Sequence, residues 1–267
     1  MEELEKIAKK LRKDILLMLN MAGSGHVGGS LSCVEILVSL YFKIMRYNAK
    51  HPSDKSRDRF VLSKGHAAPA LYATLSRAGF FPRGMLWTLR KLGSPLQGHP
   101  DSKYLVGVEA STGSLGHGLP QACGMALAGK LDRNPFRVYC LMGDGEMDEG
   151  LVWEALMSAS HYKLDNLCVI VDNNGLQIDG RCKDVMNIYP LDEKFRAFGF
   201  HTISVDGHKF SELLDAFEEA KDNKGSPTVI IAHTIKGKGV SFMEDRVEYH
   251  GVAPTDEELK KAMEEVE

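Results

Sequence analysis

Two short apolar runs, each closed by a polar turn that contains glycine, constrain the fold of this chain most. Residues 136–142 and 167–171 are almost entirely apolar and indicate buried strands. Residues 149–163 between them carry apolar side chains at helical spacing. These three segments predict a βαβ unit.

The turns that end these two strands carry the first candidate site. A Gly-Asp-Gly-Glu sequence occupies 143–146, and Asn-Asn-Gly-Leu occupies 173–176. Ligands of open parallel sheets gather outside the carboxyl ends of the strands, so both turns should lie on one edge. The glycines let backbone N–H groups approach a ligand, while Asp144 and Asn174 offer the hard oxygens that Mg²⁺ combines with phosphate and water oxygens. A metal-bound diphosphate is the predicted ligand; the alternative is a pair of ordinary turns.

These turns resemble the signature of thiamine diphosphate enzymes, and the run GDGEMDEGLVWEALMSASHYKLDNL resembles transketolases in particular. The resemblance implies a thiamine diphosphate-binding fold in which Asp144, the Asn174 side chain and the Leu176 carbonyl bind Mg²⁺, replaceable by Ca²⁺ or Mn²⁺. This ion would hold the cofactor's diphosphate. The resemblance also implies that Gly145 and Glu146 contact the cofactor.

Four histidines lie in other motifs that are similar to transketolases, such as FVLSKGHAAPALYATL. The resemblance implies that His26 lines the substrate channel and that His66, with Lys64 nearby, faces the diphosphate. It further implies that His99 contacts the terminal hydroxyl of the substrate. His250 would reach both the diphosphate and the reacting substrate. From the residues alone, His26, His66 and His99 could also be ordinary polar or structural side chains.

Two further loops carry cofactor residues by the same resemblance, which assigns Gly113, Leu115 and Lys236 to thiamine diphosphate. The glycine-rich stretch 112–118 leads into a helix rich in small residues, whose N-terminal amides could bind an anion. Without the family, this stretch could be a flexible loop before a tightly packed helix. The loop at 235–239 holds two lysines and two glycines after the last predicted strand.

Glu149 and Glu154 lie on the predicted helix after the first turn, where charged residues usually form a solvated face. The resemblance instead places them at a subunit interface, linked to a catalytic glutamate of the partner. Close carboxylates in a desolvated contact can share a proton, because like charges raise one pKa.

Near the N-terminus, two local patterns invite interpretation. Residues 23–28 match G-x-G-x-x-G, but they follow an amphipathic helix predicted over 2–21, whereas a dinucleotide fingerprint follows a strand. We therefore reject a dinucleotide site there. Ser32 and Glu35 have capping-box spacing, which predicts the start of a second helix at this point.

Five short strands, near residues 60, 138, 168, 202 and 229, alternate with helices. This order predicts an α/β fold in which helices cover both faces of a parallel sheet. A chain of 267 residues could form one large domain or two small ones; we predict a single domain over 1–267. His66, Asp144, Asn174 and Lys236 each follow a strand, which predicts that they share one site.

Composition excludes several function classes. With 33 basic and 36 acidic residues, the net charge of −3 offers no general attraction to nucleic acid or to an anionic membrane. Five cysteines without C-x-x-C spacing indicate reduced core thiols in a cytoplasmic protein and argue against zinc. The apolar run 15–22 is too short for a signal peptide, and we expect no run of the ~20 apolar residues that are needed to span a bilayer. We expect a soluble protein.

The resemblance extends over nearly the whole chain but over only the first third to half of a full-length transketolase. It therefore implies the N-terminal subunit of a split transketolase of the pentose phosphate pathway. A partner, the C-terminal subunit with the pyrimidine-binding domain, would complete an α2β2 heterotetramer. The assembly would transfer a two-carbon ketol group from a ketose phosphate to an aldose phosphate.

Three other functions are alternatives. One is a subunit of another split thiamine diphosphate enzyme: a 2-oxoacid dehydrogenase α subunit, a decarboxylase, or a transketolase-like enzyme for unusual sugars. A second is a metal-dependent diphosphate hydrolase, which the lack of a carboxylate pair for two metals disfavours. A third is a non-enzymatic binding module. The sequence assigns no role to His117, His208 or Lys238.

Overall fold

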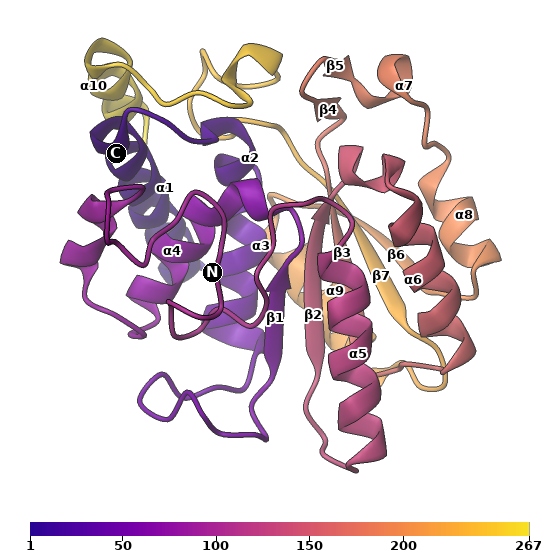
Figure 1. Cartoon of the computed structure of the whole chain (residues 1–267). Helices are drawn as coiled ribbons and strands as arrows, with labels where there is room; N and C mark the ends of the chain where they lie inside the picture. The colour runs from indigo at the N-terminus through magenta and orange to yellow at the C-terminus, as the bar shows by residue number, and fades with distance from the viewer. Residues whose placement is uncertain (267) are drawn as a thin grey trace.

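A five-stranded parallel sheet forms the centre of the protein in the computed structural model, which describes residues 1–266 (Figure 1). The predicted parallel α/β fold is confirmed, and all five predicted strands are present. The single-domain prediction stays a prediction, and its last residue, Glu267, lies outside the described range. From one edge to the other the strands are β1 (Arg59–Leu62), β2 (Val138–Gly143), β3 (Leu167–Asn173), β7 (Thr228–His233) and β6 (His201–Asp206).

Alternate side chains of β1, β2, β3 and β7 enter two different hydrophobic cores. In β2, Tyr139 and Leu141 pack into one core, whereas Val138, Cys140 and Met142 pack into the other. All five side chains are buried. Burial on both faces is typical of parallel sheets, whose strands are therefore apolar throughout. This explains why the strands appear in the sequence as continuous apolar runs.

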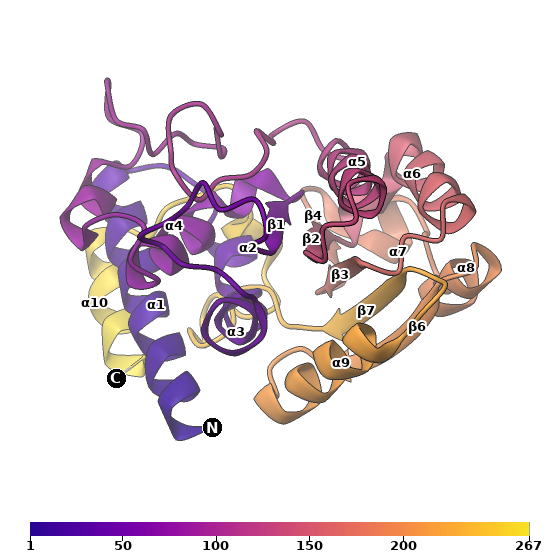
Figure 2. The same ribbon diagram turned by 90° about the horizontal axis from the view of Figure 1, so that it is seen from below.

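Helices cover both faces of the sheet (Figure 2). The first core is closed by α1 (Glu2–Ala22), α2 (Val27–Leu31), α3 (Val34–Ser39), α4 (Ala68–Arg77), α9 (Phe210–Asp222) and α10 (Asp256–Glu265). The second is closed by α5 (Gly118–Leu131), α6 (Gly150–His161) and α8 (Leu191–Ala197). Shorter elements are η1 (Leu40–Ile44), η2 (Gly65–Ala67), η3 (Arg83–Thr88), η4 (Gly145–Asp148), α7 (Cys182–Val185), η5 (Val247–Tyr249) and a hairpin of β4 (Leu176–Gln177) and β5 (Gly180–Arg181).

The first helices differ from the prediction at one point. The helix expected over 2–21 is present as α1, and Gly23 ends it with a φ of 65°. The predicted capping box at Ser32 is wrong: helical structure already begins at Val27, Ser32 lies at the C-cap position of α2, and Cys33 is the N-cap residue of α3. Its hydroxyl donates instead to Asp172 Oδ2 on β3, at 2.6 Å. A tertiary hydrogen bond has replaced the local one.

The helical stretch 27–44 is long and apolar enough, by length and composition alone, to cross a membrane. The expectation that no run has this property was therefore wrong. However, 89% of this stretch is buried inside the fold, where it contributes to the first core. Buried core helices of soluble proteins can have the same length and apolar composition, so these two properties are weak support for a membrane span. All five cysteines are free and buried, in line with the prediction of core thiols.

The start of α5 lies so close to the end of β1 that only glycine fits there. A Cβ atom on Gly118 would lie 2.5 Å from Ser63 Cα, whereas a Cβ on Gly124 of the same helix would meet nothing within 4 Å. We expect Gly118→Ala to lower the free energy of unfolding by about 1–3 kcal/mol through overpacking. Gly124→Ala should raise it by roughly 0.5–1 kcal/mol, because alanine favours the helix. Urea denaturation of both variants checks this contact, and equal effects would contradict it.

Candidate functional site

The carboxyl ends of β1, β2, β3 and β7 meet at a cavity of about 210 Å³. Segments far apart in the sequence build its wall, including the turns after these strands and the loop before α2. Every candidate site residue except Glu149 lines it: His26, Lys64, His66, His99, Gly113, Leu115, Asp144, Gly145, Glu146, Asn174, Leu176, Lys236 and His250.

Asp144 joins the two turns that follow β2 and β3. Its side chain is almost completely buried, and its two oxygens accept hydrogen bonds from the backbone N–H groups of Gly145 (2.9 Å) and Gly175 (2.6 Å). Burial raises the pKa of Asp144 to about 6. A cation beside this carboxylate would offset the cost of its desolvation.

Asn174 and Leu176 place two neutral oxygens near Asp144. The Asn174 Oδ1 atom accepts the backbone N–H of Leu176 at 3.1 Å, which fixes the turn. The Leu176 carbonyl accepts a hydrogen bond from the ammonium group of Lys236 at 3.3 Å, so this oxygen already faces a positive charge. A carboxylate, an amide and a carbonyl oxygen are the donor types that suit Mg²⁺.

Residues 1–266 contain no group of three or more His, Cys, Asp and Glu side chains that could hold a metal. A magnesium site at Asp144 would therefore depend on neutral protein oxygens and on oxygens from a ligand and from water. This is the usual situation for Mg²⁺ bound together with a phosphate group. The residues present thus fit the ion that the family resemblance implies.

Glu146 holds the glycine-rich loop against the sheet. It is 2% exposed and accepts hydrogen bonds from the backbone N–H groups of Gly116 (2.9 Å) and Gly143 (3.1 Å) and from the Ser63 hydroxyl. Burial raises the pKa of this carboxyl. Since its oxygens serve the loop that carries Gly113, Glu146 shapes the cavity; a direct contact with a cofactor stays a prediction.

Lys64 lies in the cavity wall but has a partner that the sequence did not reveal. Its ammonium group forms an ion pair with Asp172 and donates to the Gly29 carbonyl at 2.8 Å, with both charged side chains almost fully buried. Asp172 also accepts hydrogen bonds from the hydroxyls of Ser32 and Thr234. Burial acts to raise the pKa of Asp172, but the charge and hydrogen bond of Lys64 together with the hydrogen bonds of the two hydroxyls outweigh it, and the pKa is lowered. The one sequence signal for Asp172 was an acid near the end of an apolar strand.

The four candidate histidines form one cluster. The ring centroids of His66 and His250 lie 5.3 Å apart, and His26 lies 5.4 Å from His66, 5.7 Å from His250 and 6.1 Å from His99. Burial lowers the pKa of His26 to about 4 and that of His250 to about 3, and it lowers the pKa values of His66 and His99 as well. All four imidazoles are therefore neutral near pH 7, with one nitrogen to donate and one to accept a hydrogen bond.

Lys236 connects the histidine cluster to the oxygens around Asp144. Its ammonium nitrogen lies 2.6 Å from His250 Nδ1 and 3.3 Å from the Leu176 carbonyl, and only 2% of the residue is exposed. An ammonium group can only donate, so Nδ1 of His250 is the acceptor. Burial lowers the pKa of Lys236 to about 8. The cavity thus holds a desolvated cation beside oxygens that suit a metal, and this arrangement suits an anion that binds together with a metal ion.

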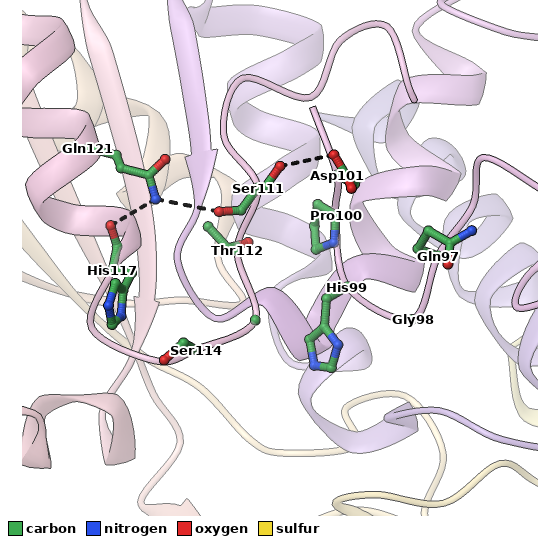
Figure 3. Close-up of a pocket in the computed structure, with 11 residues that line it drawn as sticks. Gln97, Gly98, His99, Pro100, Asp101, Ser111, Thr112, Ser114, His117 and Gln121 are labelled. Atoms are coloured by element: carbon green, nitrogen blue, oxygen red, sulfur yellow. Dashed lines mark hydrogen bonds between the residues drawn. The ribbon is translucent and has the colours of Figure 1, made fainter. Parts of the chain in front are cut away.

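A second, open hollow of about 510 Å³ adjoins the cavity and shares His99 and Gly113 with it. Figure 3 shows its polar wall: the Ser111 hydroxyl donates to Asp101 at 3.1 Å, and the amide of Gln121 donates to the carbonyl of Ser111. His117, to which the sequence assigned no role, also lines this hollow and is exposed (Figure 3).

Glu149 is the candidate that the structure does not bring to the cavity. It stands at the N-cap position of α6, and both Glu149 and Glu154 are exposed. Their exposure leaves them available to another chain, and the predicted role at a subunit interface stays a prediction.

Comparisons with known proteins give a consistent result. Residues 4–266 match the family described as "Transketolase, thiamine diphosphate binding domain". The chain is 45% identical to the 6-deoxy-6-sulfo-D-fructose transketolase subunit of Clostridium sp. (strain MSTE9), over 99% of this chain and 96% of that protein. It is 43% identical to an apulose-4-phosphate transketolase subunit of Phocaeicola vulgatus, over 99% of this chain and 94% of the relative.

A solved structure agrees with these sequence matches. The transketolase of Campylobacter jejuni superimposes on the chain with a TM-score of 0.94 and 35% sequence identity. The match covers 100% of this chain but 43% of the Campylobacter chain, so the chain spans less than half the length of that solved relative.

The ion pair between Asp172 and Lys64 predicts a large stability effect. Asp172→Asn removes the counter-charge and leaves Lys64 buried and unpaired, which should lower the free energy of unfolding by about 3–5 kcal/mol. Asp245→Asn is the matched control, because Asp245 pairs with Arg181 where the side chains are 51% and 50% exposed. That change should cost less than about 1 kcal/mol. If urea denaturation gave the same loss for both variants, Asp172 would not be the partner on which Lys64 depends.

The histidine cluster predicts a loss of stability in acid. Burial lowers the pKa of His26 from 6.5 to about 4. The unfolded chain therefore binds this proton first as the pH falls, and the stability that the neutral ring provides above pH 6.5 is lost between 6.5 and about 4. We expect wild type to lose roughly 1–2 kcal/mol relative to His26→Asn over this range, after allowing for screening of a partly exposed ring. Parallel pH profiles of the two proteins would refute this expectation.

Proposed function

The chain belongs to the family of transketolase thiamine diphosphate binding domains, and from that premise we propose that it is the N-terminal subunit of a split transketolase. The observation that carries the proposal is the cavity, where the turns at 143–146 and 173–176 meet Lys236 and the histidine cluster. Length supports it as well. Two relatives that are named subunits have nearly the same extent as this chain, whereas the solved transketolase is more than twice as long.

In this proposal the cavity holds the diphosphate of thiamine diphosphate. Asp144, Asn174 and the Leu176 carbonyl would bind Mg²⁺, or Ca²⁺ or Mn²⁺ in its place, and Lys236 would offset the remaining negative charge. When bound, the cofactor supplies a nucleophilic carbanion and accepts the electron pair released when a carbon–carbon bond breaks. The protein's part is to bind, orient and exclude water.

The histidine cluster would handle the substrate. Neutral imidazoles can each donate to one hydroxyl oxygen and accept from another, which suits a polyhydroxylated sugar. His26, His66, His99 and His250 lie close enough together to contact neighbouring groups of one ligand. Proton transfer at these nitrogens contributes most when the pKa lies near the working pH. Since burial lowers all four pKa values, we propose hydrogen bonding as their main role.

The remaining parts of the site would come from a second chain. We propose a C-terminal transketolase subunit that carries the pyrimidine-binding domain, joined to this chain in a cytoplasmic α2β2 assembly. Exposed Glu149 on α6 is available for that interface. The open hollow beside His99 shares His99 and Gly113 with the cavity, which suits an active site that is closed by another polypeptide.

Sugar phosphates are the substrates in this proposal. The reaction would be the transfer of a two-carbon ketol unit from a ketose phosphate to an aldose phosphate, as in the pentose phosphate pathway. The names of the two shorter relatives point to a second candidate, because they specify 6-deoxy-6-sulfo-D-fructose in one case and apulose 4-phosphate in the other. A donor with a sulfonate or a branched carbon skeleton is therefore the alternative to an ordinary pentose phosphate.

Reconstitution tests the proposal. The purified chain alone should be inactive, and addition of the partner chain, thiamine diphosphate and Mg²⁺ should give ketol transfer from xylulose 5-phosphate or from one of the two unusual sugars. In the assembled complex, Asp144→Ala should weaken cofactor binding at least about 10-fold by calorimetry, because it removes the only carboxylate of the proposed metal site. Asp179→Ala, an exposed aspartate of the next turn, is the control.

Other outcomes would identify the rival functions. Turnover of pyruvate by the reconstituted pair would favour a dehydrogenase α subunit or a decarboxylase. Release of phosphate from a diphosphate by the lone chain would favour a hydrolase. Undiminished cofactor binding by Asp144→Ala would contradict the proposed site.

A further inference from the structure

A buried charged cluster of Arg12, Glu35 and His208 lies outside the cavity and contacts the loop that carries Lys236. Glu35 on α3 accepts two hydrogen bonds from the guanidinium of Arg12 on α1, at 2.6 and 2.9 Å. It also accepts a hydrogen bond from Nδ1 of His208, in the turn after β6, at 2.9 Å. The side chains of Arg12 and Glu35 are 9% and 8% exposed, and that of His208 is 13% exposed. No step of the proposed function uses these residues.

The hydrogen bonds of His208 determine its tautomer. Its Nε2 atom lies 2.8 Å from the backbone nitrogen of Ile235, and a backbone N–H can only donate. Nε2 must therefore be the unprotonated acceptor, and the proton of the neutral ring must sit on Nδ1, where it is donated to Glu35. His208 thus connects a buried carboxylate to one backbone amide, and both of its nitrogens are in use.

Ile235 is the residue before Lys236, so His208 acts directly on the loop at 235–239. Other hydrogen bonds hold the same loop: Arg12 Nε donates to the Lys238 carbonyl at 2.9 Å, and the Gly237 N–H donates to the Gly28 carbonyl at 3.0 Å. The Asp245 N–H also donates to the Lys236 carbonyl at 2.9 Å. The loop also passes so close to the cluster that a Cβ on Gly239 would lie 2.7 Å from Arg12 Nε.

The position of this loop decides where the Lys236 side chain points. Lys236 reaches the Leu176 carbonyl and His250 Nδ1 from a backbone that is fixed on both sides, by His208 before it and by Gly28 and Arg12 after it. A long lysine side chain has many rotamers, and ordering it costs conformational entropy. A fixed backbone reduces the conformational entropy that is lost when a ligand binds.

We propose that His208 is a positioning residue for Lys236: by accepting the Ile235 N–H, it fixes loop 235–239 so that the ammonium group faces the anion-binding cavity. The link to a bound diphosphate rests on the proposed function, whereas the effect on the loop does not. Glu35 of the Arg12–Glu35 ion pair accepts the hydrogen bond from His208 Nδ1. A substitution of His208 alone removes neither partner of that ion pair.

Substitution of His208 by glutamine or by asparagine keeps one of its two hydrogen bonds and removes the other, so the two contacts can be tested one at a time. The side-chain oxygen of His208→Gln can take the place of Nε2 and accept the Ile235 N–H. The side-chain amide of His208→Asn is shorter and can replace only the donor at Nδ1 that serves Glu35. Both variants lose the ring, so a role that is only one of packing would affect them alike.

Hydrogen–deuterium exchange on the purified chain measures the loop without any ligand. We expect the Ile235 amide to exchange about tenfold faster in His208→Ala and His208→Asn than in wild type, the size of one lost hydrogen bond, and to stay protected in His208→Gln. His201→Ala is the matched control, because His201 lies at the other end of β6 and, like His208, contacts a glutamate, Glu219, at 2.7 Å. The His201→Ala substitution should leave the exchange rate of the Ile235 amide unchanged.

Calorimetry on the assembled complex then measures the consequence for the cavity. Thiamine diphosphate with Mg²⁺ should bind about tenfold more weakly to His208→Ala and His208→Asn and within about twofold of wild type to His208→Gln. Equal protection of Ile235 in all variants, or a His208→Gln that behaves like His208→Ala, would overturn the proposal. If wild type itself binds no thiamine diphosphate, the proposed function fails, while the exchange data still decide the role of His208. If His208→Ala does not fold, the Gln and Asn variants decide it.

Discussion

Three buried carboxylates at the carboxyl edge of the sheet organise this protein, because each must find hydrogen bonds or a counter-charge away from water. Asp144 accepts hydrogen bonds from backbone N–H groups of both turns. Glu146 accepts one from the glycine-rich loop and one from the end of β2, and Asp172 pairs with the ammonium group of Lys64. In satisfying these acids, the fold draws separate segments onto one edge. The cavity is the space that remains between them.

The two lysines of the cavity have different surroundings, and this decides what each can do. The charge of Lys64 is neutralised by the ion pair with Asp172, so Lys64 contributes more to stability than to the attraction of a ligand. Lys236 lies beside a carbonyl oxygen and an imidazole nitrogen, which solvate its charge but do not cancel it. An anion that enters the cavity would supply the missing counter-charge. The family resemblance placed both lysines near the cofactor and did not separate these two roles.

The sequence predicted the sheet well because four of its five strands, all except β6, are short apolar runs with a turn at their ends. It also predicted the convergence of Asp144, Asn174 and Lys236, since parallel strands place their carboxyl ends on the same edge. It could not predict the pairing of Lys64 with Asp172, which depends on strand register between residues 108 positions apart. It misjudged Ser32 for the same reason: a local capping pattern was overridden by a hydrogen bond to a distant strand. The contact of His208 with Ile235 likewise requires β6 and β7 to be neighbours.

The electrostatics of the histidine cluster follow from this arrangement. Burial lowers the pKa of His26 most, and the positive charges of Arg90, Lys236 and Lys64 act in the same direction. A bound anion would oppose those charges and raise the pKa values of the rings beside it. Ligand binding and protonation are therefore coupled in this cavity: neutral imidazoles before binding would become stronger bases once a diphosphate is in place. A protein that keeps its histidines neutral until the anion arrives gains hydrogen-bonding groups for a sugar without adding repulsion between neighbouring rings.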